Sequence, residues 1–248
     1  MHGFQSDVAM LAVDLPENLD ASPTRPVGRA AWLSLGAALL RSAAAHLQID
    51  ASELASGVRP WVHHDGRILG EVFVHDTLPN GAGYAEEVAG NVEAILRRAH
   101  ELCAHCPGRC ETACYRCLLD YGNQRQHGLL DRHLVRSLLG YVLDGSEPEI
   151  SRKEQLDALR RLEPFVPPEV MRIDARIGDT EVPATISLPG GRRYSLWPLH
   201  PLRLPPKGLA AEVARETGTV ALFPNEFDLI RRPFWVWNGI LNGRTGRL

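Results

Sequence analysis

The 248-residue sequence predicts an α+β protein, with a mixed sheet, packed helices and a smaller strand-rich C-terminal part. Three observations support this fold class. Apolar residues recur at helical spacing between residues 30 and 160, with short apolar runs typical of strands among them. Beyond Pro164 prolines multiply and polarity alternates, which is typical of short strands. All five cysteines fall between residues 103 and 117, where two expected helices meet.

The composition is that of an ordinary globular protein, with 44% hydrophobic and 23% charged residues. No apolar run reaches the ~20 residues that span a bilayer, and the N-terminus lacks the basic and apolar stretches of a signal peptide. We therefore expect a cytoplasmic protein without a membrane partner. In a reducing compartment, clustered cysteines favour a metal site over disulfides.

Apolar periodicity and turn residues predict the elements upstream of the cysteines. They are, in order, a strand at 4–15, a helix at 30–47, a short helix from Asp50, a strand at 67–77, a turn at 78–83 and a helix from Tyr84 to Leu102. In the first long helix, Trp32, Leu35 and Leu39 share one face. The last helix has a regular apolar stripe that leads directly into Cys103.

Two further helices are expected after the cysteines. Asp131 can cap a helix that stops at Gly145, and Ser151 with Glu154 forms a capping box for a helix that ends before Pro164. A strand is expected at 182–188. We place a domain boundary between these helices, which gives an N-terminal domain at 1–148 and a C-terminal α+β extension at 149–248.

The cysteine spacing is Cys103-x2-Cys106-x3-Cys110-x3-Cys114-x2-Cys117. Four thiolates around a tetrahedral zinc ion form the commonest structural site of this kind, and short spacers give a compact knuckle between two helices. Structural zinc supplies roughly 10–16 kcal/mol of apparent binding free energy, more than this loop could gain from its few apolar residues. One of the five cysteines is then spare.

Iron–sulfur chemistry is the alternative for the same cysteines. The last three match the CxxxCxxC spacing of radical-SAM enzymes, but Arg116 stands where an aromatic residue is usual, and too little chain follows for a large αβ barrel. A structural [4Fe–4S] cluster on four cysteines remains open at this stage, because ligand type alone does not separate it from zinc.

The segment CPGRCETACYRCLLDYGNQRQHGLLDR resembles the MrfA-like zinc-binding domain, which follows DEAD/DEAH-type helicases and also occurs in the DrmB component of the DISARM phage-defence system. Residues 4–140 resemble the family. The resemblance implies Cys106, Cys110, Cys114 and Cys117 as ligands of a structural zinc ion, with Cys103 as the alternative first ligand. Matching positions are Cys117-Leu118, Tyr121, Asn123, His127 and Leu130-Asp131-Arg132. We expect Asn123 and His127 to support the knuckle, by bonding the thiolates or by capping the loop.

The resemblance implies a non-catalytic accessory module of a helicase-linked DNA repair or phage-defence system, partnered by a helicase. The sequence contains no GxxxxGK[ST] loop, so we expect no ATPase activity, no small-molecule substrate, and a motor on another polypeptide or segment. The alternative is a metal-dependent enzyme, either a nuclease or an iron–sulfur protein with redox or radical chemistry.

Two other segments offer weaker candidate sites. We expect the HHDG segment at 63–66 to be a solvated loop, because His63 and His64 would point to opposite faces of a strand. We also expect the His-Asp pair at 75–76 to be solvated, and neither segment to form a second metal or nuclease site. Gly81 and Gly83 precede a helix as in a phosphate-binding loop, but Glu86 replaces the third glycine, so a tight turn without ligand is favoured.

Weak, sequence-independent DNA binding is expected from local charge. The net charge is −3, but residues 97–136 hold seven arginines against four acids, and residues 203–248 hold six arginines and one lysine against four acids. In the tail, aromatic residues lie close to arginines in the sequence, a combination that suits base stacking and phosphate contact. The candidate residues are Arg231, Arg232, Trp235 and Trp237. Composition bias alone would also produce such an arginine excess.

Overall fold

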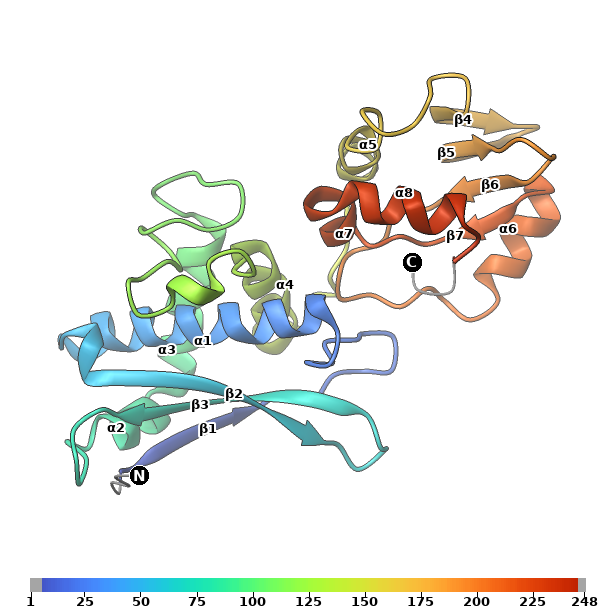
Figure 1. Cartoon of the computed structure of the whole chain (residues 1–248). Coiled ribbons are helices and arrows are strands. Elements are labelled where there is room, and N and C mark those ends of the chain that lie inside the picture. Colours follow the sequence, from blue (N-terminus) through green and yellow to red (C-terminus); the bar gives the residue numbers. More distant parts are fainter. Residues whose placement is uncertain (1–5, 245–248) are drawn as a thin grey trace. The chain divides into compact units, whose positions relative to one another are not determined.

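The computed structural model describes residues 6–244, which form two compact units that divide between Pro148 and Glu149 (Figure 1). Both units combine helices with a sheet, so the α+β class is confirmed. The first two positions of the strand expected at 4–15 lie outside the described residues. No helix within residues 6–244 is long and apolar enough to cross a membrane.

The first unit is built on an antiparallel sheet with strand order β1-β3-β2. Its strands are β1 (Val8–Ala12), β2 (Leu54–Val62) and β3 (Ile68–Asp76), and its helices are α1 (Pro26–Leu47), α2 (Tyr84–Gly90), α3 (Val92–Ala104) and α4 (Arg132–Asp144). Two short 3₁₀ turns are η1 (Ala51–Glu53) and η2 (Gln124–Gln126). Helix α1 crosses one face of the sheet and contacts α3 and α4 (Figure 1).

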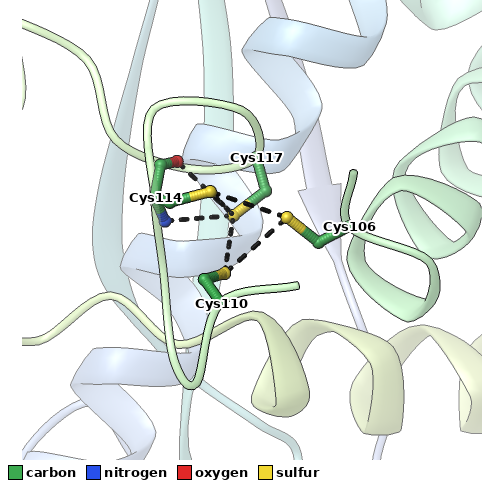
Figure 2. Close-up of side chains that lie close together, drawn as sticks. All are labelled: Cys106, Cys110, Cys114 and Cys117. Carbon is green, nitrogen blue, oxygen red and sulfur yellow. Dashed lines mark hydrogen bonds between the residues drawn. The ribbon is translucent and has the colours of Figure 1, made fainter. Parts of the chain in front are cut away.

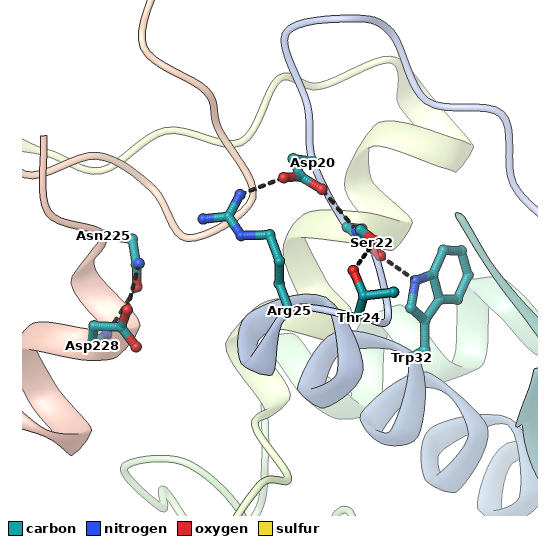
Figure 3. A network of polar contacts seen from close by, with 8 residues as sticks. Asp20, Ser22, Thr24, Arg25, Trp32, Asn225 and Asp228 are labelled. Atoms are coloured by element: carbon teal, nitrogen blue, oxygen red, sulfur yellow. Dashed lines mark hydrogen bonds and ion pairs between the residues drawn. The ribbon is translucent and has the colours of Figure 1, made fainter. Parts of the chain in front are cut away.

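The start of α1 is fixed by polar contacts around its buried tryptophan. Pro26 occupies the first helical turn, and the fully buried Trp32 donates its indole N–H to the Ala21 carbonyl at 2.6 Å (Figure 3). Asp20 accepts the Ser22 amide at 2.9 Å and pairs with Arg25. A Cβ at Gly70 of β3 would come within 2.4 Å of the Trp32 ring, so this strand position must stay glycine.

Two expectations for this unit are corrected. The single helix expected from Tyr84 to Leu102 is divided into α2 and α3 at Gly90–Asn91, although the apolar stripe continues across the break. Strand β2 was not among the expected elements, and it contains Gly57 and Pro60, two residue types that are unfavourable in strands. The short helix from Asp50 is the 3₁₀ turn η1, in which the Asp50 carboxylate accepts the Ser52 amide at 2.8 Å.

The second unit has a mixed sheet with strand order β4-β5-β6-β7, in which only the β6–β7 pair is parallel. Its strands are β4 (Met171–Ile177), β5 (Thr180–Ser187), β6 (Arg193–Leu196) and β7 (Val220–Leu222), and its helices are α5 (Arg152–Arg160), α6 (Leu209–Thr217), α7 (Glu226–Arg231) and α8 (Pro233–Leu241). The capping box at Ser151 and Glu154 is present at the start of α5. Its core joins α5 and α8 to the inner residues of β5 and β6.

Candidate metal centre

The cysteine-bearing loop lies between the end of α3 and the start of α4, as Figure 2 shows from close by. Its four sulfur atoms at Cys106, Cys110, Cys114 and Cys117 all lie within 4.8 Å of one another. Cys106 and Cys117 are buried, and the other two are half-buried. The loop therefore gathers four thiols at one point.

The sulfur–sulfur distances test which metal group fits. Four of the six sulfur pairs lie at 3.6 Å (Cys106–Cys114), 3.7 Å (Cys106–Cys110), 3.6 Å (Cys110–Cys117) and 3.8 Å (Cys114–Cys117), and the other two lie within 4.8 Å. A tetrahedron with Zn–S bonds of ~2.3 Å has edges of about 3.8 Å. The cluster therefore fits one zinc ion. A four-iron cluster would fill the space between its cysteine sulfurs and hold them farther apart, so it does not fit.

A central cation would change the protonation state that these thiols favour. Burial raises the pKa of Cys110 and of Cys117. At Cys106 burial also acts to raise the pKa, but hydrogen bonds with the Gly108 backbone and with Cys114 and Cys110 outweigh it and lower the pKa to about 7. Four thiolates this close repel one another, and a divalent cation between them removes that repulsion and favours the ionised form.

Cys103 lies apart from this group. It is fully buried at the end of α3, and burial raises the pKa of its thiol to about 12, so the thiol stays protonated. The sequence left Cys103 and Cys106 as alternatives for the first ligand, and the structure brings Cys106 to the cluster. An open hollow of about 460 Å³ lies beside Cys106 and is lined in part by Arg109 and Arg132.

Two arginines from neighbouring helices hold the loop by its main chain. Arg132 of α4 donates to the carbonyls of Cys103 at 2.8 Å and Cys110 at 3.0 Å, on either side of the first ligand. Arg41 of α1 donates to the carbonyls of Tyr115 at 2.7 Å and Leu119 at 3.2 Å, on either side of the last ligand. Both arginines thus position the ligand-bearing segments without touching a thiol.

Asn123 and His127 cap the loop that follows the last ligand. The Asn123 side chain accepts the Asp120 amide at 2.9 Å and donates to the Leu118 carbonyl at 2.8 Å. His127 Nε2 lies 2.9 Å from the Asp120 carbonyl and 2.8 Å from Asn123 Oδ1. Within the described residues neither side chain bonds a thiol, so their contacts are those of loop capping.

Sequence reasoning did not find the roles of Arg41 and Arg132. Arg132 stands in the Leu-Asp-Arg segment that resembles the zinc-binding family, and this is the one signal that pointed to it. Arg41 carried no signal, because its partners are carbonyls 74 and 78 residues away. Every residue has a main-chain carbonyl, so the sequence does not show which carbonyls accept a hydrogen bond.

Arg132→Ala is expected to weaken zinc binding by about 10-fold or more, because the carbonyls of Cys110 and Cys103, on either side of Cys106, lose their donor. Arg132→Lys should restore little, since one ammonium cannot reproduce the planar fork that reaches both carbonyls. Competition with a chromophoric chelator measures the affinity. Arg136→Ala, an exposed change on the same helix, is the control. Equal zinc affinity in Arg132→Ala and Arg136→Ala would remove Arg132 from the positioning role.

The anion site suggested by Gly81 and Gly83 is already filled by a side chain of the protein. The buried Asp76 carboxylate accepts the amides of Ala82 at 2.5 Å, Tyr84 at 3.2 Å and Ala85 at 2.8 Å at the start of α2. The expectation of a tight turn without ligand therefore agrees with the structure. The same contacts remove Asp76 from any metal site with His75.

The HHDG segment differs from the expected solvated loop. His63 is buried, with Nε2 3.1 Å from Asp14 Oδ1, and its ring centroid lies 3.9 Å from that of the exposed His64. His63 Nδ1 lies 2.9 Å from Asp65 Oδ1 but without the alignment of a hydrogen bond. Strand β2 ends at Val62, so both rings belong to a turn and not to a strand. Among residues 6–244 only the four cysteines form a group suited to a metal.

The candidate DNA-binding residues of the C-terminal tail lie partly in the core and partly at the surface. Trp237 is 8% exposed and packs in the core, whereas Trp235 is 38% exposed and carries Arg232 over its ring at 4.4 Å. Arg232 also pairs with the buried Asp228 at 2.7 Å, and Asp228 in turn donates its amide to Asn225 at 2.9 Å (Figure 3). Arg231 lies over the Phe227 ring at 4.8 Å. The Trp237 ring is thus closed to a base in this structure.

An α+β domain whose loop closes four thiols around one point, with no ligand position left open, defines a structural zinc-binding domain. The sequence model of the MrfA Zn-binding domain matches residues 35–118 of this chain. This match confirms the resemblance for that part of the chain and agrees with zinc as the metal. The matched segment ends one residue after the last cysteine of the cluster.

Relatives of the chain are much longer proteins. Druantia protein DruE of Escherichia coli (strain UMEA 4076-1) is 33% identical over 170 residues, which is 65% of this chain and 9% of DruE. The crystal structure of DUF1998 helicase MrfA bound to DNA and AMPPNP shares 22% identity with a TM-score of 0.35, over 54% of this chain and 15% of that one. MrfA bound to DNA shares 25% identity with a TM-score of 0.30, over 38% and 12%. The chain thus spans about a tenth of its curated relative.

Proposed function

We propose that this protein is a non-catalytic zinc-binding accessory module of a helicase-linked DNA repair or phage-defence system. The observation that carries the proposal is the closed four-thiol cluster within a segment that matches the MrfA Zn-binding domain. Four protein ligands leave no position for water or substrate, which is the arrangement of a structural zinc site. Zinc then holds α3 and α4 together through the knuckle.

We assign the helicase-associated zinc-binding domain to residues 1–148 and a C-terminal extension to residues 149–248. A helicase subunit or domain is the proposed partner, and the cytoplasm the proposed location. The kinship to Druantia protein DruE and the match to a domain named after a helicase support this assignment. The DISARM system is one setting in which a domain of this type is expected.

We also propose weak, sequence-independent contact with DNA. In the second unit the half-exposed Trp235, with Arg232 over its ring, remains a candidate for that contact, as does Arg231, the residue before Arg232 in the chain. Trp237 is left out because its ring is buried. The exposed indole offers a stacking face to a nucleic-acid strand, and Arg232 over its ring is paired with Asp228.

The purified zinc-loaded chain is expected to show no ATP turnover and no metal-dependent DNA cleavage. The sequence has no phosphate-binding lysine loop, and residues 6–244 hold no cluster of carboxylates suited to a metal. Phosphate release from ATP, with and without DNA, and nicking of a supercoiled plasmid with Mg²⁺ or Mn²⁺ measure both activities. Turnover that follows the protein through a second purification, at constant specific activity, would overturn the accessory role.

A further inference from the structure

The zinc knuckle exposes two aromatic side chains that pack against little of the protein. Tyr121 is 83% exposed and Tyr115 is 62% exposed. Within residues 107–129, these two are the only large hydrophobic side chains that are exposed, because Leu118 is buried and the other leucines are half-buried. Neither tyrosine ring belongs to the core of the unit, so their exposure needs another explanation.

His127 joins the two tyrosines into one surface. Its ring meets that of Tyr115 edge-on, with centroids 5.7 Å apart and an angle of 84°. Its Nε2 lies 2.9 Å from the carbonyl of Asp120, the residue before Tyr121. His127 is therefore close to both tyrosines, to Tyr115 through its ring and to Tyr121 through the main chain of the preceding residue.

This surface is held rigidly on its loop. Tyr121 follows Asp120 in a tight turn, in which the Asp120 carboxylate accepts the Gly122 amide at 2.8 Å and the Asn123 amide donates to the Asp120 carbonyl at 3.3 Å. Tyr115 lies between two metal ligands, and its carbonyl is bound by Arg41. A surface ordered in advance loses little conformational entropy on binding.

Two arginines lie beside the tyrosines, together with Asp120, whose carboxylate accepts the Gly122 amide. Arg116 is next to Tyr115 and Arg125 lies in η2 after Tyr121; both are exposed. Neither arginine forms an ion pair within the described part of the chain, whereas Arg97 and Arg67 pair with Glu93 and Asp65. We call Tyr115, Arg116, Tyr121 and Arg125 the knuckle surface.

We propose that the knuckle surface binds an unpaired nucleic-acid strand, an inference that rests on the DNA contact proposed above and gives it a location. The tyrosine rings stack on bases, and Arg116 and Arg125 contact phosphates. An unpaired strand is specified because bases in a duplex already cover one another. A protein partner fits less well, because the surface lacks the apolar centre of a protein interface.

The test is fluorescence anisotropy of labelled oligothymidylate with the zinc-loaded full chain at several salt concentrations. Tyr121→Ala should weaken binding roughly 5-fold or more, whereas Tyr121→Phe, which keeps the stacking ring, should bind like wild type. Arg116→Ala/Arg125→Ala should also make the log–log salt slope shallower by about 1.4. Arg98→Ala, an exposed change on α3, is the control for lost charge.

A labelled duplex separates stacking from charge. Tyr121→Ala should leave duplex affinity unchanged, while Arg116→Ala/Arg125→Ala should lower it. If both variants keep zinc and bind oligothymidylate like wild type, the knuckle surface is not the nucleic-acid site, and a loss confined to Trp235→Ala would return that role to the tail. If the wild-type chain itself binds no strand, the proposed DNA contact fails together with this location.

Discussion

Cys110→Ser and Cys114→Ser are each expected to abolish stable zinc binding and to unfold the knuckle. Each residue supplies one of four sulfurs that all lie within 4.8 Å of one another, and the chain has no free thiol in position to replace it. Apparent zinc-binding free energies of about 10–16 kcal/mol rival the whole stability of a domain, about 5–15 kcal/mol. Elemental analysis and thermal unfolding of the purified variants measure the loss.

Cys103→Ser is the matched control for these variants, because its buried thiol lies outside the cluster. This variant should retain one zinc ion per chain, with a small loss of stability from a hydroxyl placed in the core. Full zinc and full solubility in Cys110→Ser or Cys114→Ser would refute the ligand set. Loss of zinc in Cys103→Ser but not in Cys106→Ser would show that the first ligand has been misplaced.

Asp76→Ala is expected to destabilise the first unit by about 3–5 kcal/mol. The Asp76 carboxylate is buried and accepts three main-chain amides that begin α2, and Ala leaves all three without an acceptor. Hydrogen bonds to a charged group contribute about 1.5–3 kcal/mol each, and they do not add fully. Urea unfolding monitored by circular dichroism measures the change.

Two further variants serve as comparisons for Asp76→Ala. Asp76→Asn keeps the shape and one acceptor oxygen, so its stability should fall between those of wild type and Asp76→Ala. Asp50→Ala removes a similar carboxylate-to-amide bond to Ser52 at an exposed turn, and its effect should be much smaller. If Asp76→Ala unfolds at the same urea concentration as Asp50→Ala, water replaces the carboxylate and the turn does not depend on it.

The helices around the metal were predictable because capping residues and apolar spacing act locally. Asp131 and Gly145 bound α4 as their residue types indicate. Strand β2 was missed because the presence of glycine and proline in it is explained only by the neighbouring residues and strands. A Cβ at Gly57 would come 2.2 Å from the Phe73 ring, and Pro60 is tolerated because β2 is an edge strand.

The cysteine spacing predicted a knuckle, and the family resemblance indicated which four residues hold the ion. Spacing could not show how the knuckle is fixed, because Arg41 and Arg132 act on carbonyls that any residue could supply. Local composition was also a poor guide to the tail. The sequence of the aromatic run around Trp237 does not show which rings face solvent and which face the core. The ring of Trp237 faces the core.

The metal content of the native chain tests the central claim most directly. Native mass spectrometry, with elemental analysis of the same sample, should find one zinc ion per chain, no iron and no inorganic sulfide, in a colourless protein. Chelation should then abolish the cooperative unfolding of the first unit. Iron with sulfide in a brown protein, or a chain that keeps its stability after complete removal of zinc, would contradict a structural zinc site formed by four thiolates.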